Sequence, residues 1–495
     1  MNDCQKIFDS VAAAAGFICV FARLILRRLI GLLGTLMRYR VQVASVYLLG
    51  FFLDLVNMFI ANVAYPDIGR HFNAPLSQLA WVSNAYMLGL TLVIPISGWL
   101  ASRVGGKRVL MASLALFMLA TCGVGASASL TQLIVWRGLQ GMGGGLLIPL
   151  GQTLTYALFR PHERAKLSSA VMLVALLAPA LSPALGGVLV EHLGWRGVFL
   201  ISLPLALLTF TLAGCGLKQE PPTPNTEPLD SVGLVSGCAA LTLLLLGLTW
   251  LGEAHAAARG AATLLAGALC LTGFIRHSLR TRAPLLNLRL LNAPRLRTAM
   301  LLYHGVPGVF TGVNLLAMLY LQGPLGMRAT WVGAMMLPWA AAAFVAISLT
   351  GKTFNRGGPR PLFLAGCVTQ ALGMGLLATL AHDGMAIRCA AAFALMGFGG
   401  SLVSSAAQSA AFVDLADADL ADASALWNIN RQLSFCGGVT LMSLLFALLL
   451  LTGQPQAHAY RLCFIFAACS AAIPLLCCMR LANTPGISPL TQEKK

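Results

Sequence analysis

The chain has 495 residues, of which 58% are hydrophobic and only 10% are charged, and its mean hydropathy is +0.80. This composition excludes a soluble globular protein and predicts a membrane protein with many spans. The formal net charge of +17 is compatible with nucleic-acid binding, but the basic residues lie in short loops between apolar runs, where they mark membrane topology instead. We therefore expect the lipid bilayer, and no nucleic acid, as a partner of this chain.

Residues 1–40 form a basic N-terminal extension that differs from the rest of the chain. Its apolar run, residues 11–21, is too short to cross a bilayer and is followed by arginines such as Arg27 and Arg28. An interfacial helix on the anionic inner leaflet fits this pattern, whereas a signal peptide carries its basic residues before the apolar run. The alternative is that translation starts at Met37 and that the extension is not part of the mature protein.

Fourteen apolar runs follow, most of them near the length of about 20 residues that a helix needs to cross a bilayer. They are residues 43–66, 80–101, 109–126, 132–156, 166–190, 197–216, 231–251, 260–275, 298–321, 330–350, 361–381, 389–411, 424–451 and 462–479. Most lysines and arginines lie in segments on the side of the N-terminus, so the positive-inside rule places both termini in the cytoplasm. The sequence predicts an all-α, multi-pass protein of the inner (cytoplasmic) membrane.

The first run contains Asp54, the one carboxylate that we place well inside a predicted span. Asn57 stands three residues further on and therefore lies on nearly the same face of a helix. Ionisable groups inside a membrane normally face the interior of the bundle and mark a functional site. We expect Asp54 to couple transport to protons; the alternative is an aspartate at the helix end, level with the lipid headgroups.

The second run ends in a loop that is both basic and rich in glycine, as expected of a tight turn on the cytoplasmic side. Its residues of interest are Gly98, Arg103, Gly105, Lys107 and Arg108.

The fourth run carries Arg137 among apolar residues, followed by Gly141, Gly143, Gly144 and Gly145. An unpaired guanidinium there costs ~2.5 to 3.5 kcal/mol, even on the lenient insertion scale. Small residues let neighbouring membrane helices approach closely. We therefore predict a packed interior helix whose arginine acts together with a carboxylate in proton coupling.

The fifth run contains Pro179 and Pro183, which remove backbone donors and bend a helix. Gly186 and Gly187 follow and allow close packing against a neighbour. After the sixth run, the proline-rich stretch 218–230 is predicted to be the linker between two halves.

An internal repeat relates the two halves. Gly141, Gly143, Gly144 and Gln152 recur at one constant offset as Gly397, Gly399, Gly400 and Gln408, and the basic loop recurs at nearly the same offset as Gly351, Arg356, Gly358 and Arg360. A duplicated half is the plan of many secondary transporters. The alternative is chance similarity between glycine-rich helices.

These motifs resemble those of the major facilitator superfamily, and specifically of its fourteen-span drug/proton antiporter group. GWLASRVGGKR is similar to the signature GxLaDrxGrk between helices two and three, RGLQGMGGG to RxxQGxGgg in helix four, and SPALGG to the antiporter signature GPxxGG in helix five. WNINRQLSFCGG resembles a motif of the penultimate helix of that group.

The sequence departs from the family pattern at four positions. Ser102 and its repeat counterpart Asn355 stand where the signature has a loop aspartate, which puts the charge-pair latch of that loop in doubt. The aspartate of the family's first helix aligns with Asn57, one turn after Asp54. Ser182 replaces the first glycine of the helix-five signature.

The resemblance implies a major facilitator fold with two six-helix halves and two inserted helices. We expect the N-terminal half at 41–216, the linker with two extra helices at 217–297, the C-terminal half at 298–481 and a cytoplasmic tail at 482–495. It further implies a gating role for the basic loop and an antiport role for Pro179, Ser182, Pro183, Gly186 and Gly187. The residues expected in a polar substrate cavity are Asn57, Asn62, Gln140, Gln152, Asn314, Gln408 and Arg431.

Motifs of other function classes are missing from the sequence. It contains no GxxxxGK[ST], HExxH, CxxC or GxSxG, so we expect no enzyme activity, ATP-driven pump, cofactor or metal site. The expected function is proton-coupled efflux of small, hydrophobic or cationic compounds. The alternatives are export of a specific metabolite or metal chelate, and a non-transporting membrane sensor, which the missing loop aspartate favours. A periplasmic adaptor with an outer-membrane channel is a further partner that the sequence leaves open.

Overall fold

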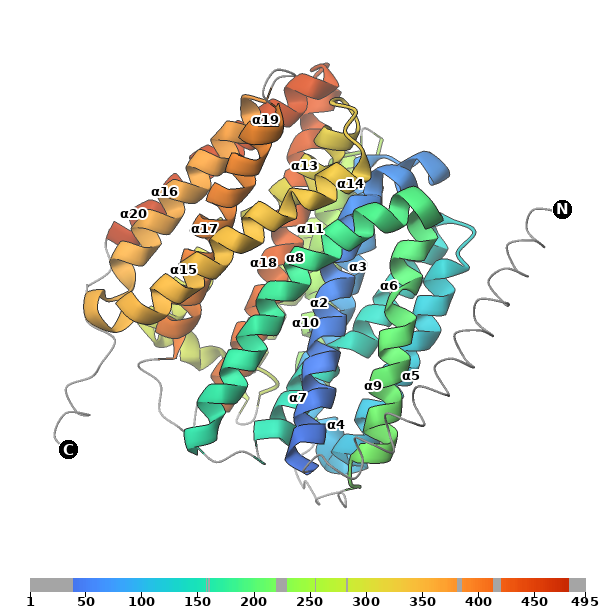
Figure 1. The fold of residues 1–495 in the computed structure, drawn as a ribbon, viewed down its shortest axis with the longest axis vertical. Helices are drawn as coiled ribbons and strands as arrows, with labels where there is room; N and C mark the ends of the chain where they lie inside the picture. Colours follow the sequence, from blue (N-terminus) through green and yellow to red (C-terminus); the bar gives the residue numbers. More distant parts are fainter. Residues whose placement is uncertain are drawn as a thin grey trace, which may run out of the picture.

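A computed structural model describes residues 39–479 except 157, 159–160, 220–228, 254, 282–283, 381–384 and 413–419. The N-terminal extension before residue 39, most of the proline-rich linker and the C-terminal tail lie outside the described residues. All secondary structure within the described ranges is helical. The expected all-α architecture is confirmed (Figure 1).

The helices follow one another in the order that the apolar runs predict, and they are grouped here by the two halves and the inserted pair that the sequence predicts. The first half consists of α2 (Tyr39–Phe72), α3 (Leu76–Val93), η1 (Ile94–Ile96), α4 (Ser97–Val104), α5 (Gly106–Gly125), α6 (Leu130–Gly145), α7 (Leu147–Tyr156), α8 (Pro161–Leu200) and α9 (Ser202–Gly216). The inserted pair is α10 (Ser231–Leu251) and α11 (Ala257–Arg280). The second half consists of η2 (Leu288–Asn292), α12 (Pro294–Tyr303), η3 (His304–Gly308), α13 (Val309–Gln322), α14 (Ala329–Ala334), α15 (Met336–Gly357), α16 (Pro359–Ala378), α17 (Met385–Ala411), α18 (Leu420–Leu451), α19 (Gln456–Ser470) and α20 (Ala472–Met479).

Thirteen helices of the described part are long and apolar enough to cross a membrane. One of these candidates, Leu181–Gly216, contains the end of the fifth predicted run and all of the sixth. Gly194 separates the two runs inside α8 with a φ of 68°, a value that favours glycine. The carboxylate of Asp67 then accepts a hydrogen bond from the Trp195 amide, 3.1 Å away, at the first residue of the next crossing. All fourteen predicted runs therefore lie on helices of the structure.

The glycines of the internal repeat have the same role in both halves. A Cβ on Gly141 of α6 would collide with the carbonyl oxygen of Tyr86, and a Cβ on Gly397 of α17 would collide with that of Trp339. Gly105 and Gly358, which precede α5 and α16, both have positive φ values, of 94° and 70°. Equivalent glycines therefore allow equivalent close helix contacts and turns, as a duplicated half requires.

The two halves meet most closely at one end of the bundle. We call the end that carries α4 and the loop Ser102–Arg108 the basic end, at the bottom of Figure 1, and the other end the opposite end. At the opposite end, α8 of the first half runs against α14 of the second (Figure 1). Gly187 packs on the backbone of Ala329, and Gln322 donates to the carbonyl oxygen of Val63 at 3.2 Å. The bundle is therefore held together at the opposite end.

The inserted pair α10–α11 packs against both halves. The indole Nε1 of Trp81 in α3 donates to the Thr249 hydroxyl of α10 at 2.9 Å, while Gly252 at the end of α10 lies against Ala447 of α18. The pair thus spans the boundary between α3 and α18.

At the basic end, Asp230 organises the start of this pair. Its carboxylate accepts hydrogen bonds from the amides of Gly233 and Leu285 and lies 2.7 Å from Nε2 of His277. Burial alone would raise the pKa of Asp230, but these hydrogen bonds and the neighbouring imidazole outweigh it and lower that pKa. Asp230 therefore remains an ionised cap that ties α10 to the end of α11.

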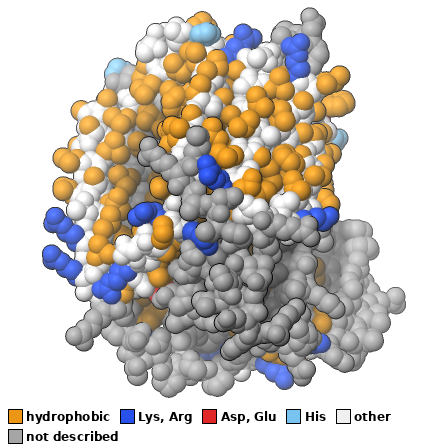
Figure 2. Space-filling view, turned by 90° about the vertical axis from the view of Figure 1, so that its left-hand side faces the viewer, with side chains coloured by type: hydrophobic (Ala, Val, Ile, Leu, Met, Phe, Trp, Pro, Cys, Tyr) orange, Lys and Arg blue, Asp and Glu red, His pale blue; other side chains and the backbone are white. Residues whose placement is uncertain are grey.

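The outer surface of the bundle is apolar, as a bilayer requires. Leu265 and Leu269 of α11 are 64% and 66% exposed, and Ile473 of α20 is 68% exposed. Figure 2 shows hydrophobic side chains over most of the described surface of one face, with lysine and arginine side chains mainly in its lower part. This distribution fits a multi-pass membrane protein.

Candidate functional site

Asp54 lies in the middle of α2 with an exposed fraction of 1%. The prediction that this carboxylate lies well inside the span is therefore confirmed. The hydroxyl of Tyr86 in α3 donates a hydrogen bond to Oδ1 of Asp54 at 2.6 Å. The other oxygen, Oδ2, is buried and has no hydrogen-bond partner in the described part of the chain. Oδ1 is thus held by a hydrogen bond, and Oδ2 is available to a proton or a cation.

A glycine makes room for this carboxylate. A Cβ on Gly144 of α6 would lie 2.9 Å from Oδ1 of Asp54 and 3.0 Å from the Tyr86 hydroxyl. Any larger residue at position 144 would push the acid away from the tyrosine. The glycine run of the fourth predicted span therefore shapes the site as well as the helix packing.

Arg137 is completely buried in α6, as predicted, and its hydrogen bonds connect three elements. Nε donates to the carbonyl oxygen of Val82 at 3.0 Å, and Nη1 donates to Oε1 of Gln140 at 2.7 Å. Nη2 donates to the carbonyl oxygen of Asn57 at 3.3 Å. The guanidinium also lies 4.2 Å from the ring centre of Tyr86, within range of a cation–π interaction. Backbone carbonyls and the Tyr86 ring therefore stabilise the buried charge of Arg137. The hydrogen bond to the Asp54 carboxylate comes from the Tyr86 hydroxyl.

Asn57 and Gln140 form the polar support of this arginine. Nε2 of Gln140 donates to Oδ1 of Asn57 at 3.1 Å and to the Thr121 hydroxyl at 2.7 Å. Nδ2 of Asn57 donates to the carbonyl oxygen of Leu53 at 3.0 Å. Each amide therefore has partners for both its donor and its acceptor side, which fixes the position of Arg137 relative to α2.

A second arginine, Arg431, lies on α18 of the other half. The positive charges of Arg431 and Arg137 both favour the ionised form of Asp54. Nε of Arg431 is buried and has no hydrogen-bond partner in the described part of the chain. Asp54 is thus subject to the charge of one arginine that hydrogen bonds hold within its own half and of one arginine of the other half, whose Nε has no partner among the described residues.

A cavity of about 200 Å³ lies between the halves, beside this charge cluster. It reaches from the middle of the bundle towards the basic end, and it is smaller than the ~300 to 1,000 Å³ of typical ligand sites. Its described lining residues are Phe51, Leu55, Met58, Phe59, Pro179, Tyr303, Pro307, Phe310, Thr311, Trp339, Ala343, Ile347, Met396, Gly400, Ser401, Ser404, Ser405, Gln408, Arg431, Gln432 and Phe435. Six of them are aromatic, and Phe310 stacks on Trp339 with the ring centres 5.8 Å apart.

The residues expected in the substrate cavity fall into three groups. Gln408 and Arg431 line the cavity. Asn57 and Gln140 belong to the buried support of Arg137 instead. Asn62, Gln152 and Asn314 are not among the described lining residues, although Asn314 is buried with its Oδ1 unpartnered.

Sequence reasoning missed several residues that shape the site. Tyr86 was not singled out, although it stands in a polar group with Ser83 and Asn84 inside an apolar run, and that group was the available signal. The aromatic lining had no such signal, because aromatic residues are common on any membrane helix. Nε2 of His304 lies 3.0 Å from Oδ1 of Asn430, as expected of a histidine that supports helix packing.

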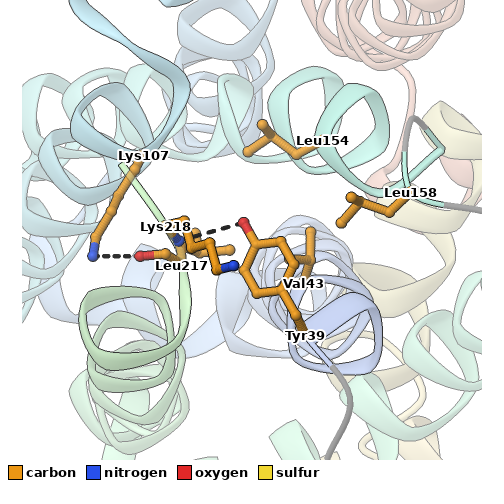
Figure 3. Close-up of a pocket in the computed structure, with 7 residues that line it drawn as sticks. All are labelled: Tyr39, Val43, Lys107, Leu154, Leu158, Leu217 and Lys218. Atoms are coloured by element: carbon orange, nitrogen blue, oxygen red, sulfur yellow. Dashed lines mark hydrogen bonds between the residues drawn. The ribbon is translucent and has the colours of Figure 1, made fainter. Parts of the chain in front are cut away.

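The basic loop is attached to the end of α9 within its own half (Figure 3). Nζ of Lys107 donates to the carbonyl oxygens of Gly214 and Leu217 at 2.7 and 2.6 Å. The amide of Lys218 donates to the Tyr39 hydroxyl at 3.3 Å. Lys107 thus satisfies carbonyls that the end of a helix leaves free.

The other residues of the loop have local partners. Arg108 lies beside the side-chain amide of Gln219, and Arg103 lies 4.9 Å from the ring centre of Trp99. The hydroxyl of Ser102 donates to the carbonyl oxygen of Trp99 at 2.8 Å. A Cβ on Gly98 would meet open space. Gly105 has a φ of 94°, a backbone conformation that favours glycine. The side chains of Asn355 and Arg356, the repeat counterparts, lie outside the description.

The proline-containing helix α8 contacts α14 and α15 of the second half. Pro179 lines the cavity, and the hydroxyl of Ser182 donates back to the carbonyl oxygen of Ala178. The carbonyl oxygen of Pro183 lies directly against Gly333 of α14. Gly186 packs on Ile60 of α2, and Gly187 packs on Ala329 as described above. The predicted group of small residues and prolines therefore lies at the boundary between the halves.

Known proteins are similar to this chain in sequence and in fold. The family model described as Major Facilitator Superfamily matches residues 47–439. The chain is 29% identical over 419 residues to the multidrug resistance protein B homolog of Mycobacterium tuberculosis, covering 82% of this chain and 76% of that protein. It is 30% identical over 333 residues to the drug efflux pump JefA of the same organism, covering 67% and 65%. An auto-inhibited peptide transporter of the POT family has the same fold, with a TM-score of 0.65 at 17% identity over 90% of this chain and 98% of that chain.

Proposed function

The chain belongs to the major facilitator superfamily of membrane transporters, and from this premise we propose that it exports small, hydrophobic or cationic compounds across the cytoplasmic membrane in exchange for protons. The observation that carries the proposal is the buried carboxylate of Asp54, which accepts a hydrogen bond from Tyr86 and whose neighbours in α2 line a cavity together with residues of the second half. A titratable group placed there can respond to protons and to the relative position of the halves.

Export of drug-like compounds is supported by the relatives. They are described as a multidrug resistance protein homolog and as a drug efflux pump. The aromatic lining of the cavity supports the same substrate class, because aromatic faces bind apolar groups and attract organic cations.

Proton coupling is supported by the surroundings of Asp54. Ionisation of a carboxyl group in an apolar membrane interior costs free energy, and protonation removes that cost. Each proton that enters along the membrane potential supplies ~2.3 kcal/mol per 100 mV before any pH difference is added. If proton and substrate each weaken the binding of the other, this energy drives export.

The contacts between the halves support alternating access. The halves touch through glycine and proline backbone at the opposite end, and the cavity lies between the middle and the basic end. With the basic end in the cytoplasm, this conformation presents the cavity to the inside. The same orientation places both termini in the cytoplasm.

Export of a specific metabolite is the second candidate, because the cavity is small and fold does not determine substrate. The missing loop aspartate no longer favours a membrane sensor, because Lys107 attaches the basic loop to the end of α9 without an aspartate.

Transport into proteoliposomes tests the proposal. Proteoliposomes that contain the purified protein with its basic end outside are prepared with either an acidic or an alkaline interior. A panel of neutral, cationic and anionic compounds is then added. We expect accumulation of hydrophobic or cationic compounds only when protons run in the opposite direction. Movement that is unaffected by the gradient would remove the proton coupling, and no movement of any compound would favour the sensor.

A further inference from the structure

Tyr86 of α3 contacts both buried charged groups of the first half. Its hydroxyl donates to Oδ1 of Asp54 at 2.6 Å, and the centre of its ring lies 4.2 Å from the guanidinium carbon of Arg137. Arg137 directs its hydrogen bonds within the described part of the chain to other groups, and none of them joins it to Asp54. One neutral side chain therefore stands in contact with an acid and a base that do not pair with each other.

We infer that Tyr86 is a positioning residue that keeps Asp54 and Arg137 apart and thereby sets the pH range in which Asp54 takes up and releases its proton. The inference rests on the proposed function, in which Asp54 is the proton site, and goes beyond it by assigning control of that site to a tyrosine. The hydroxyl and the ring have separate effects. The hydroxyl stabilises the ionised carboxylate, and the ring prevents a direct ion pair with the arginine.

Arg137 lies close enough to α2 for such an ion pair to form if Tyr86 were absent. Its Nη2 donates to the carbonyl oxygen of Asn57, about one helical turn from Asp54 on the same helix. A guanidinium in direct contact strongly favours the ionised form of a carboxyl group. A neutral hydroxyl also favours that form through its hydrogen bond, but it adds no opposite charge. The contact with Tyr86 therefore leaves Asp54 able to exchange a proton.

Close contacts with α6 determine the position of Tyr86. A Cβ on Gly141 would overlap the backbone carbonyl oxygen of Tyr86, and a Cβ on Gly144 would lie 3.0 Å from its hydroxyl. The tyrosine has an exposed fraction of 0%. The glycines of α6 thus let α3 approach until the Tyr86 ring contacts Arg137 and its hydroxyl reaches Asp54.

The charged and titratable groups around this pair lie on few elements of the described structure. Asp54 is influenced by Tyr86, by Arg137 and by Arg431 of α18, and Arg137 is influenced in addition by Tyr65 of α2. The other helices that pack against α2, namely α7, α8, α9, α13 and α14, add no such group at Asp54 among their described residues. Without the Tyr86 ring, the carboxylate with which Arg137 would pair is therefore that of Asp54.

Infrared difference spectra of the purified full-length protein in detergent measure the proton directly. A protonated carboxyl group has a C=O stretching band that the carboxylate lacks, and loss of this band in Asp54→Asn assigns it. We expect Tyr86→Phe to shift the midpoint of the titration to higher pH by about 1 unit, because the ring remains and the hydrogen bond to the ionised form is lost. Tyr65→Phe, which removes a buried hydroxyl that bonds to Ser83, is the matched control and should leave the midpoint unchanged. An unchanged midpoint in Tyr86→Phe would overturn the inference.

Tyr86→Leu tests the separation of the charges. Leucine lacks both the hydroxyl and the ring, so Arg137 can pair with Asp54, and we expect a midpoint at least about 1 unit lower than in Tyr86→Phe. Arg137→Gln in the Tyr86→Leu background should raise the midpoint at least to that of Tyr86→Phe. Arg259→Gln in the same background removes an arginine of α11 that lies over Trp250 and should leave the midpoint unchanged. Equal midpoints in Tyr86→Leu and Tyr86→Phe would also overturn the inference.

Gly144→Ala gives a test that retains the tyrosine. Its Cβ would push Asp54 away from the hydroxyl, so the midpoint should rise as in Tyr86→Phe, and an unchanged midpoint would count against the inference. The titration does not depend on transport, which separates the two proposals. If the midpoint shifts as expected but wild-type export does not follow it, the proposed function fails and the role of Tyr86 stands. If export depends on Asp54 but Tyr86→Phe leaves the midpoint unchanged, the inference alone fails, and if Asp54→Asn removes no titrating band, both fail.

Discussion

Asn84 of α3 donates a hydrogen bond to the hydroxyl of Thr440 in α18, 2.7 Å away, and both side chains are buried where the two halves meet. This bond crosses the boundary that must open when the transporter exposes its cavity to the other side. Buried hydrogen bonds between membrane helices contribute about 0.6 kcal/mol on average. The bond is therefore strong enough to bias the conformation and weak enough to be broken in each cycle.

We expect Asn84→Ala and Thr440→Val each to lower the thermal stability of this conformation and to raise the fraction of molecules that are open at the opposite end. A double-mutant cycle on the unfolding free energy should give a coupling of about 0.6 kcal/mol. Labelling of a cysteine introduced near Val63 measures the opening. Additive effects of the two substitutions would show that the bond does not hold the halves.

The contact between Gly333 and Pro183 should tolerate no side chain. A Cβ on Gly333 would overlap the carbonyl oxygen of Pro183, and neither that oxygen nor the Cα of Gly333 can move aside locally, because both belong to helix backbone. We expect Gly333→Ala to prevent closure at the opposite end and to reduce export by more than about 10-fold with normal insertion. Gly273→Ala in α11, where a Cβ meets open space, is the matched control and should transport normally.

The repeat and the helix order could be predicted because they depend on residues that the sequence shows directly. Apolar runs of bilayer length and glycines at a constant offset determine where helices cross and touch. The kink between the fifth and sixth crossings was not predicted, because an apolar run does not show that Gly194 takes the non-helical φ of 68° at which the chain turns.

The site was predicted only in part. Asp54 and Arg137 were identified from the rarity of charge in apolar runs, but their actual partners depend on the rotation of each helix. Arg137 was expected to act together with a carboxylate, but the hydroxyl of Tyr86, which was not singled out, donates the hydrogen bond to Asp54. Periodicity places a residue on a face of its helix; it does not state which face of the next helix lies opposite.

Lys107 should stabilise the basic end through the carbonyls of Gly214 and Leu217. We expect Lys107→Met to lower the unfolding free energy by about 1.5 to 3 kcal/mol, the range for hydrogen bonds to a charged group. Lys218→Met is the matched control, because the ammonium of Lys218 is exposed and only lies 5.1 Å from the Tyr39 ring centre. Thermal unfolding in detergent gives the unfolding temperature of both variants. Equal shifts of this temperature would argue against a stabilising role of Lys107 at the end of α9.

Arg137→Lys should impair transport although it retains the positive charge. The guanidinium bridges Val82, Gln140 and Asn57 with donors in a planar fork, and an ammonium cannot reach all three from one position. We expect reduced stability and at least about 10-fold slower proton-driven export. The measurement is export across a pH series beside Arg259→Gln. An unchanged pH profile in Arg137→Lys would mean that this residue only supports the fold.

Asp54→Asn should separate folding from coupling. The amide oxygen can still accept the hydrogen bond from Tyr86, and the loss of a buried charge does not disturb packing beside Gly144. The protein should therefore insert and fold. Because an amide takes up no proton in this range, export driven by a pH gradient should be lost, and binding of a cation should no longer vary with pH.

Asp67→Asn is the matched control, since Asp67 lies in the same helix but near the opposite end, where it accepts a hydrogen bond from Trp195. Asn57→Asp in the Asp54→Asn background moves the carboxylate one turn along α2. There it would accept from Gln140 and lie next to Arg137, which already donates to the Asn57 carbonyl. Only partial recovery of proton-driven export is expected, because the carboxylate returns to the same helix but lies one turn from its original position beside Tyr86. Export by Asp54→Asn at the wild-type rate under a pH gradient would show that protons bind elsewhere.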